Sequence, residues 1–329
     1  MEQLLNYDDS KALAFQRPSL KSVDEKTLAE MPVYNILCGK QAGLPFDYLM
    51  TDIYSGCLPI KSICYGNCSA AEYWINKGHN FGMRRINNFD EALFRESISN
   101  LPVNQRWLRQ GWVSDCSLSK KSWDLLAVTS DILMEHNIRL VIITKVFTKP
   151  SAEVMQTLAK NKAEFRVSIS AIDSRHEIER RFESLEAYRE AGGMAVPYLM
   201  SFKFADDPLK TNQELIVSKI VEDDYIAAEH PLRLSNDNTG LESAETDRYY
   251  HPKFADQAWF GRLYAQTGNF LLPPPTFLPA EYTFHFLRYT DLLRSGASYS
   301  FNNLPTYQDL LEKNLIHKNT FDHANYDVK

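Results

Sequence analysis

The sequence predicts an α/β fold built on a parallel β-sheet, and three observations support this. Segments rich in apolar and β-branched residues recur along the chain, as expected of strands buried on both faces of a sheet. Segments with helical apolar spacing alternate with them, which requires crossover connections between parallel strands. About six such strand–helix units fit between residues 46 and 236. This is too few for a closed eightfold barrel, so a partial barrel or a doubly wound sheet remains.

The first predicted strand, 46–56, leads directly into a cysteine-containing loop, and a polar stretch of helical character follows over about 70–100. Further strands are expected at 106–115, 138–147, 164–173, 195–204 and 225–235. Helices are expected between them at 122–137, 151–161, 176–193 and 211–222. Ser151 is a favourable N-cap residue, and Gly192 offers a left-handed end to the helix before it.

The composition of the chain changes at both ends of this repeating part. Residues 1–46 form a mixed, proline-containing leader that we expect to pack on the main domain, 47–236. Residues 237–329 begin as a polar stretch, continue through a proline-rich segment and include an aromatic-rich helical pattern. We expect this C-terminal extension to cover the open side of the sheet and the substrate.

Charge and cysteine usage restrict the classes of partner. The formal net charge of -6 gives no reason to expect a nucleic-acid backbone as the main partner. No apolar run approaches the ~20 residues that a membrane-spanning helix needs, and the N-terminus lacks a secretory pattern, so a cytoplasmic protein is expected. Five bunched cysteines favour metal or redox chemistry over a disulfide scaffold.

Three of the cysteines, Cys57, Cys64 and Cys68, lie in the stretch "GCLPIKSICYGNC" with the spacing C-x6-C-x3-C. Thiolates select zinc or iron–sulfur clusters, and a structural zinc site would normally add a fourth ligand at short spacing. The three positions directly follow the first strand, at the edge of a parallel sheet where ligands gather. They therefore suggest a cluster with one open iron, while a closed zinc site and three buried cysteines that bind no metal stay as alternatives.

This loop resembles that of the radical S-adenosylmethionine (SAM) superfamily. Its spacing is similar to divergent members, including phage-associated proteins, rather than to the usual C-x3-C-x2-C form. The stretch "IITKVFTKPSAEVMQTLAKNKAEFRVSISAID" and the following Glu- and Arg-rich helix, which ends "AGG", resemble the branch that contains spore photoproduct lyase. The resemblance covers roughly residues 47–235.

The resemblance implies a partial (β/α)6 TIM-like barrel and a [4Fe-4S] cluster held by Cys57, Cys64 and Cys68. SAM would bind the fourth iron, and one-electron reduction would cleave it to methionine and a 5′-deoxyadenosyl radical that abstracts hydrogen from a small-molecule substrate. Flavodoxin or ferredoxin is the implied electron donor. The alternatives are a non-enzymatic iron–sulfur or zinc module and a barrel enzyme whose cysteines are structural.

The resemblance also implies SAM contacts near the loop and at the end of the next strand. Tyr65 would lie near the adenine, against simple packing of the loop. Ser114 and Asp115 would bind the SAM amino group, although Asp115 is also suited to cap the following helix. Cys116 is a candidate catalytic hydrogen-atom relay, but a lone cysteine is more often a small buried residue.

Four further candidates follow the later strands. Lys145 is costly to bury unpaired, so it should face the cavity and meet a carboxylate, namely that of SAM. Ser168 and Ser170 share one face of a strand, either the cavity or the helix layer, and would contact the ribose. Arg181 would reach the SAM carboxylate, against the reading of "EIERRFE" as a solvated charged face.

Overall fold

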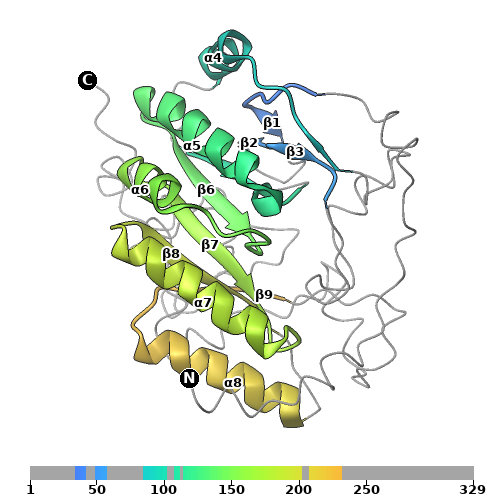
Figure 1. The fold of residues 1–329 in the computed structure, drawn as a ribbon, viewed down its shortest axis with the longest axis vertical. Coiled ribbons are helices and arrows are strands. Elements are labelled where there is room, and N and C mark those ends of the chain that lie inside the picture. The colour runs from blue at the N-terminus through green and yellow to red at the C-terminus, as the bar shows by residue number, and fades with distance from the viewer. Residues whose placement is uncertain are drawn as a thin grey trace, which may run out of the picture. The chain divides into compact units, whose positions relative to one another are not determined.

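The computed structural model of the protein describes residues 34–41, 49–57, 84–101, 107–111, 114–201 and 207–231. Figure 1 shows the described helices and strands along the chain. The predicted C-terminal extension, most of the leader and the three candidates Tyr65, Cys64 and Cys68 lie outside the described residues. No helix of the described segments is both long and apolar enough to cross a membrane.

In the described part of the chain, seven strands form one sheet in the order β1-β2-β5-β6-β7-β8-β9. Their bounds are β1 (Lys40–Gln41), β2 (Leu49–Thr51), β5 (Trp107–Gln110), β6 (Arg139–Thr144), β7 (Glu164–Ile169), β8 (Met194–Ser201) and β9 (Ala228–Pro231). Strand β1 is antiparallel to β2, whereas β2 with β5, β5 with β6, β6 with β7 and β8 with β9 are parallel pairs. The predicted α/β fold with a mostly parallel sheet is confirmed. From β2 onward the strands follow chain order, without the reversal that marks a doubly wound sheet.

The helices of the described segments are α4 (Glu91–Ser99), α5 (Lys120–Glu135), α6 (Ala152–Lys160), α7 (Arg175–Glu190) and α8 (Asp207–Glu222). The predicted N-cap of α6 is confirmed, because the Ser151 hydroxyl accepts a hydrogen bond from the Val154 amide at 3.3 Å. Gly192, just after α7, has φ +83°, the left-handed conformation expected there. Helical periodicity located α5 to α8 to within a few residues because each has a continuous apolar stripe or a strong end signal.

The chain divides into two compact units. One consists of Arg17–Val167 with Arg180–Ala195, and it contains β2, β5, β6 and most of β7. The other consists of Met1–Gln16, Ser168–Glu179 and Val196–Lys329. In this second unit the Ser201 hydroxyl donates to the buried carboxylate of Glu229 at 2.7 Å, and the Asn212 amide donates to a backbone carbonyl at 2.8 Å.

The two faces of the sheet can be told apart at β7. Phe165 packs against Trp123 of α5 and Tyr188 of α7, with ring centroids 6.0 and 5.0 Å away, so Phe165 faces the helices. Successive side chains of a strand point to opposite faces, so Glu164 and Arg166 lie on the face turned away from α5 and α7.

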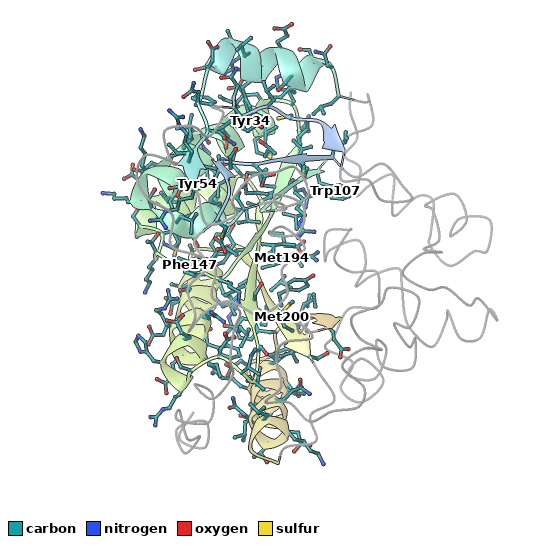
Figure 2. All side chains as sticks on the ribbon, turned by 90° about the vertical axis from the view of Figure 1, so that its right-hand side faces the viewer. Tyr34, Tyr54, Trp107, Phe147, Met194 and Met200 are labelled. Carbon is teal, nitrogen blue, oxygen red and sulfur yellow. The ribbon has the colours of Figure 1, made fainter. Side chains whose placement is uncertain are left out.

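We call this face the far face, and the strand registers extend it to its neighbours, because residues paired across parallel strands share a face. It comprises Met50, Trp107, Arg109, Arg139, Val141, Ile143, Glu164 and Arg166. Figure 2 shows Trp107 on the side of the sheet away from α5.

Candidate functional site

The first described residues of the cysteine segment are held by a short two-stranded ribbon. Strand β3 (Tyr54–Ser55) pairs in antiparallel fashion with β4 (Arg85–Ile86), and this pairing brings together the two ends of segment 56–84. The buried side chain of Asn87 reinforces the closure, because its amide donates to the Asp52 carbonyl at 2.9 Å and its oxygen accepts from the Ser55 hydroxyl at 2.7 Å. The segment with three cysteines therefore begins and ends at the same point of the structure, beside the paired strands β3 and β4.

That place is the carboxyl end of β2, next to the carboxyl end of β5. The Tyr54 hydroxyl is hydrogen-bonded to the hydroxyl of Ser119, the N-cap of α5, at 2.8 Å. The Ser114 hydroxyl donates to Asp52 Oδ1 at 3.3 Å, so the ends of β5 and β2 are also connected directly. Cys57 is buried beside this junction. The expected strand 46–56 is therefore two strands, because the chain leaves the main sheet after Thr51 to pair with β4.

Asp115 is the centre of a buried hydrogen-bond network that joins the loops after β5 and β6. Its Oδ1 accepts from the Ser117 amide at 2.9 Å, from the Ser117 hydroxyl at 2.6 Å and from the Thr144 hydroxyl at 2.6 Å. Its Oδ2 accepts from the Lys145 amide at 2.8 Å. Asp115 is also the N-cap of the 3-10 helix η2 (Cys116–Leu118), whereas the N-cap of α5, the helix that the sequence predicted to follow, is Ser119. A SAM contact by the same carboxylate stays a prediction.

Both backbone polar groups of Lys145 are held by hydrogen bonds to side chains. Its amide donates to Asp115, and its carbonyl accepts from Arg181 Nε at 3.2 Å. The next residue, Val146, has φ +54°, a rare conformation for a β-branched residue, and its carbonyl accepts from Arg180 Nη1. Alternation along β6, extended by one residue, directs the half-buried Lys145 side chain to the far face, and its contact with the SAM carboxylate stays a prediction.

Arg181 corrects one interpretation of the sequence. The reading of "EIERRFE" as a solvated charged face is wrong for this residue, because Arg181 is completely buried. A buried guanidinium needs hydrogen-bond acceptors, and the Lys145 carbonyl is one of them. The structure thus gives Arg181 a role in positioning the loop after β6, while a direct contact with SAM stays a prediction.

Ser168 lies on β7 two residues beyond Arg166, so the alternation puts it on the far face and not in the helix layer. Ser170 follows the end of the strand. Its amide donates to Asp173 Oδ2 at 2.7 Å and its carbonyl accepts from the Asp173 amide at 3.1 Å, which makes a tight turn. The sequence placed both serines on one continuous strand, whereas only Ser168 belongs to it. The ribose contacts stay predictions.

Cys116 is completely buried in η2. Burial and, secondarily, the nearby charge of Asp115 raise the pKa of its thiol well above the ordinary value. The thiol is therefore protonated, which matches the interpretation as a small buried residue; the relay role stays a prediction. Among the described residues no group of three or more His, Cys, Asp or Glu side chains is arranged to hold a metal ion, and Cys64 and Cys68 lie outside those residues.

Sequence reasoning did not single out the charged residues of the far face. Glu164 and Arg166 form an ion pair buried on β7, and Arg109 lies in the same row of the sheet as Glu164. The alternating pattern of "EFRVS" carried this signal for Glu164 and Arg166, because a charge at every second strand position predicts one polar face, whereas "RWLRQ" has no such alternation of charge.

Comparison of the chain with protein-family models and with curated proteins found no match.

Proposed function

We propose that this protein is a radical SAM enzyme in which Cys57, Cys64 and Cys68 hold a [4Fe-4S] cluster. The observation that carries the proposal is the three-thiol segment, which begins and ends at the carboxyl end of the first parallel strand. The main-sheet strands β2, β5, β6, β7, β8 and β9 follow one another in chain order, and this supports a partial barrel with its ligand site at that same edge.

The residues present fit an iron–sulfur cluster. Three thiols within one short segment provide the soft ligands that such clusters require, and Cys57 is buried where the hydrogen bonds of Asn87 hold the base of the segment. The cluster, when bound with SAM, supplies one-electron reductive cleavage of SAM. The protein contributes binding, orientation and exclusion of water.

The loop after β6 supports the same function. Asp115 and Arg181 hold the two polar groups of the Lys145 peptide, so little freedom remains where the Lys145 side chain leaves the backbone. A cation fixed on the far face at the carboxyl edge is suited to bind the SAM carboxylate, because ionised groups make the stronger hydrogen bonds. In this proposal Lys145 binds SAM, while Asp115 and Arg181 act as positioning residues.

The test is anaerobic reconstitution of the full chain with iron and sulfide, followed by dithionite and SAM. We expect about four iron and four sulfide per chain and formation of 5′-deoxyadenosine. Cys57→Ala should lose the cluster and the product. The matched control is Cys38→Ala, which removes a buried thiol outside the segment and should keep both. An intact cluster that leaves SAM uncleaved would refute the enzymatic proposal and favour an electron-transfer or structural module.

A Lys145→Met variant tests the role of the lysine separately. It should retain the cluster and weaken SAM binding by about tenfold or more, because a hydrogen bond to a charged group contributes about 1.5–3 kcal/mol. The measurement is the SAM concentration that gives half-maximal product formation. An unchanged value would show that Lys145 does not contact SAM.

A further inference from the structure

The loop after β6, residues 145–148, is held by hydrogen bonds along its length. Each of its amides donates one, and the acceptors in chain order are Asp115 Oδ2 at 2.8 Å, Thr144 Oγ1 at 2.9 Å, Ser117 Oγ at 2.8 Å and the Ser117 carbonyl at 2.9 Å. The Thr148 carbonyl accepts from Trp123 Nε1 at 2.9 Å. Side chains, rather than the ladder of a sheet or helix, therefore fix the path of this loop.

Two successive arginines of α7 bind two successive carbonyls of this loop. Arg181 Nε donates to the Lys145 carbonyl at 3.2 Å, and Arg180 Nη1 donates to the Val146 carbonyl. Arg181 is completely buried, whereas Arg180 is half-buried. A guanidinium group keeps its charge and donates charge-assisted hydrogen bonds, so both carbonyls have strong donors.

Val146 has a backbone conformation that its own side chain disfavours. Its φ of +54° is an outlier for a β-branched residue, and its side chain is completely buried. A residue stays in such a conformation only where its surroundings hold it, and such residues are concentrated at functional sites. Both backbone polar groups of Val146 are held, because its amide donates to Thr144 Oγ1 and its carbonyl accepts from Arg180.

The conformation of Val146 affects the residue before it. The chain is fixed on one side by strand β6, which ends at Thr144, and on the other by the bond from the Phe147 amide to Ser117. A change of φ at Val146 between these two fixed points must be taken up by neighbouring backbone dihedral angles, and those of Lys145 are the nearest. Relaxation of Val146 would therefore move the start of the Lys145 side chain.

We propose that Arg180 is a positioning residue for Lys145. By binding the Val146 carbonyl, Arg180 keeps Val146 in the left-handed conformation and so fixes the place from which the Lys145 side chain extends. Without this bond Val146 relaxes, and only a fraction of the molecules hold Lys145 in its place. The consequence for SAM rests on the proposed function, in which Lys145 binds the SAM carboxylate. The effect on the loop itself rests only on the bonds of Val146.

Hydrogen exchange of the full chain, measured by mass spectrometry on peptides that cover residues 145–148, tests the loop without SAM. Arg180→Met removes the donor and keeps much of the length of the side chain. We expect these amides to exchange about tenfold faster or more, because the variant loses a charge-assisted hydrogen bond that keeps the loop closed. Arg189→Met, at an exposed ion pair of the same helix, is the matched control and should leave the rates unchanged. Wild-type exchange rates in Arg180→Met would overturn the inference, and so would an equal increase in α6, which would indicate general loss of stability.

The SAM concentration that gives half-maximal product formation tests the consequence for Lys145. Arg180→Met should raise it by about three- to tenfold, because apparent affinity falls with the fraction of molecules in the binding-competent form, while the rate at saturating SAM changes by less than about twofold. In a Lys145→Met background the same substitution should have no further effect, because no lysine remains to be positioned. A merely structural role would impair SAM use equally in both backgrounds, and that result would overturn the inference.

The two measurements separate this inference from the proposed function. Formation of 5′-deoxyadenosine with unchanged exchange in Arg180→Met would leave the radical SAM assignment standing and remove the role of Arg180. Faster exchange of residues 145–148 in a protein whose intact cluster does not cleave SAM would leave that role standing and remove the radical SAM assignment. If Arg180→Met does not fold, Arg180→Lys keeps a charged donor of shorter reach, and the same two comparisons decide.

Discussion

Replacement of Asp115 by asparagine tests how the loops after β5 and β6 are held together. The change keeps the size of the side chain but exchanges one carboxylate oxygen for an N–H2 group. If the amide oxygen keeps the bonds from Ser117 and Thr144, its nitrogen faces the Lys145 amide, and two donors oppose each other. The part-buried Lys145 N–H then loses its acceptor.

The size of the expected loss of stability follows from the four hydrogen bonds that the Asp115 carboxylate accepts. An unsatisfied buried donor costs about 1–3 kcal/mol. The three remaining bonds lose their charge assistance, at about 1 kcal/mol each. Relaxation of the loops recovers part of this, so we expect Asp115→Asn to lower the free energy of unfolding by about 3 kcal/mol. With a urea m-value of about 3 kcal/mol/M the midpoint would fall by about 1 M.

The assay is equilibrium urea unfolding followed by circular dichroism. Asp124→Asn, at an exposed position of α5, is the control for loss of one negative charge and should change stability by less than about 0.5 kcal/mol. Thr144→Val should cost about 1–2 kcal/mol, and combined with Asp115→Asn it should cost less than the sum, because Asp115→Asn has already weakened the bond that Thr144→Val removes. Equal midpoints for Asp115→Asn and the control would refute the network as a source of stability.

Three further predictions concern the fold itself. Gly111→Ala should prevent stable folding, because a Cβ there would lie 2.4 Å from the Ile143 carbonyl oxygen. Gly192 has open space around it, so Gly192→Ala should lower the free energy of unfolding by only about 1 kcal/mol. Thermal unfolding of the two variants compares these effects. Burial raises the pKa of Tyr188 above that of an unfolded tyrosine, so its contribution to stability is complete below about pH 10 and is lost above it. The free energy of unfolding of Tyr188→Phe should therefore fall less between about pH 9 and pH 11 than that of the wild type. An equal fall in both proteins would exclude Tyr188 as the source of the pH dependence. Burial raises the pKa of Cys38 to about 12 and that of Cys116 well above its usual value. Thiol labelling at about pH 8, mapped by mass spectrometry, should therefore modify both cysteines only in denaturant. Labelling of either cysteine in the native protein would contradict their burial.

The parallel sheet and its helices could be predicted from the sequence because their signals are local. The apolar run around Ile142 and the cap at Ser151 each specify an element within a few residues of chain. The ends of the elements were less accurate where tertiary pairing decides them. The break after Thr51 depends on β4, which lies more than 30 residues further along the chain.

Some features of the candidate site could not be predicted from the sequence, because they too depend on partners that are distant in the chain. Lys145 is expected on the cavity side because a charge at a strand end is costly to bury, and its role there stays a prediction. Only the alternative reading of Arg181, as part of a solvated charged face, was wrong, because its acceptor, the Lys145 carbonyl, is distant in sequence and local charge spacing contains no information about it. The charges of Arg109 and Glu164 were visible in the sequence, but only the strand register shows that they lie in one row.

The most direct test of the central claim is the electron paramagnetic resonance spectrum of the reduced, reconstituted protein with and without SAM. If one iron has an open position for SAM, addition of SAM should change the spectrum of the reduced cluster, and Cys57→Ala should show no cluster signal. A cluster whose spectrum is the same with and without SAM would contradict the account.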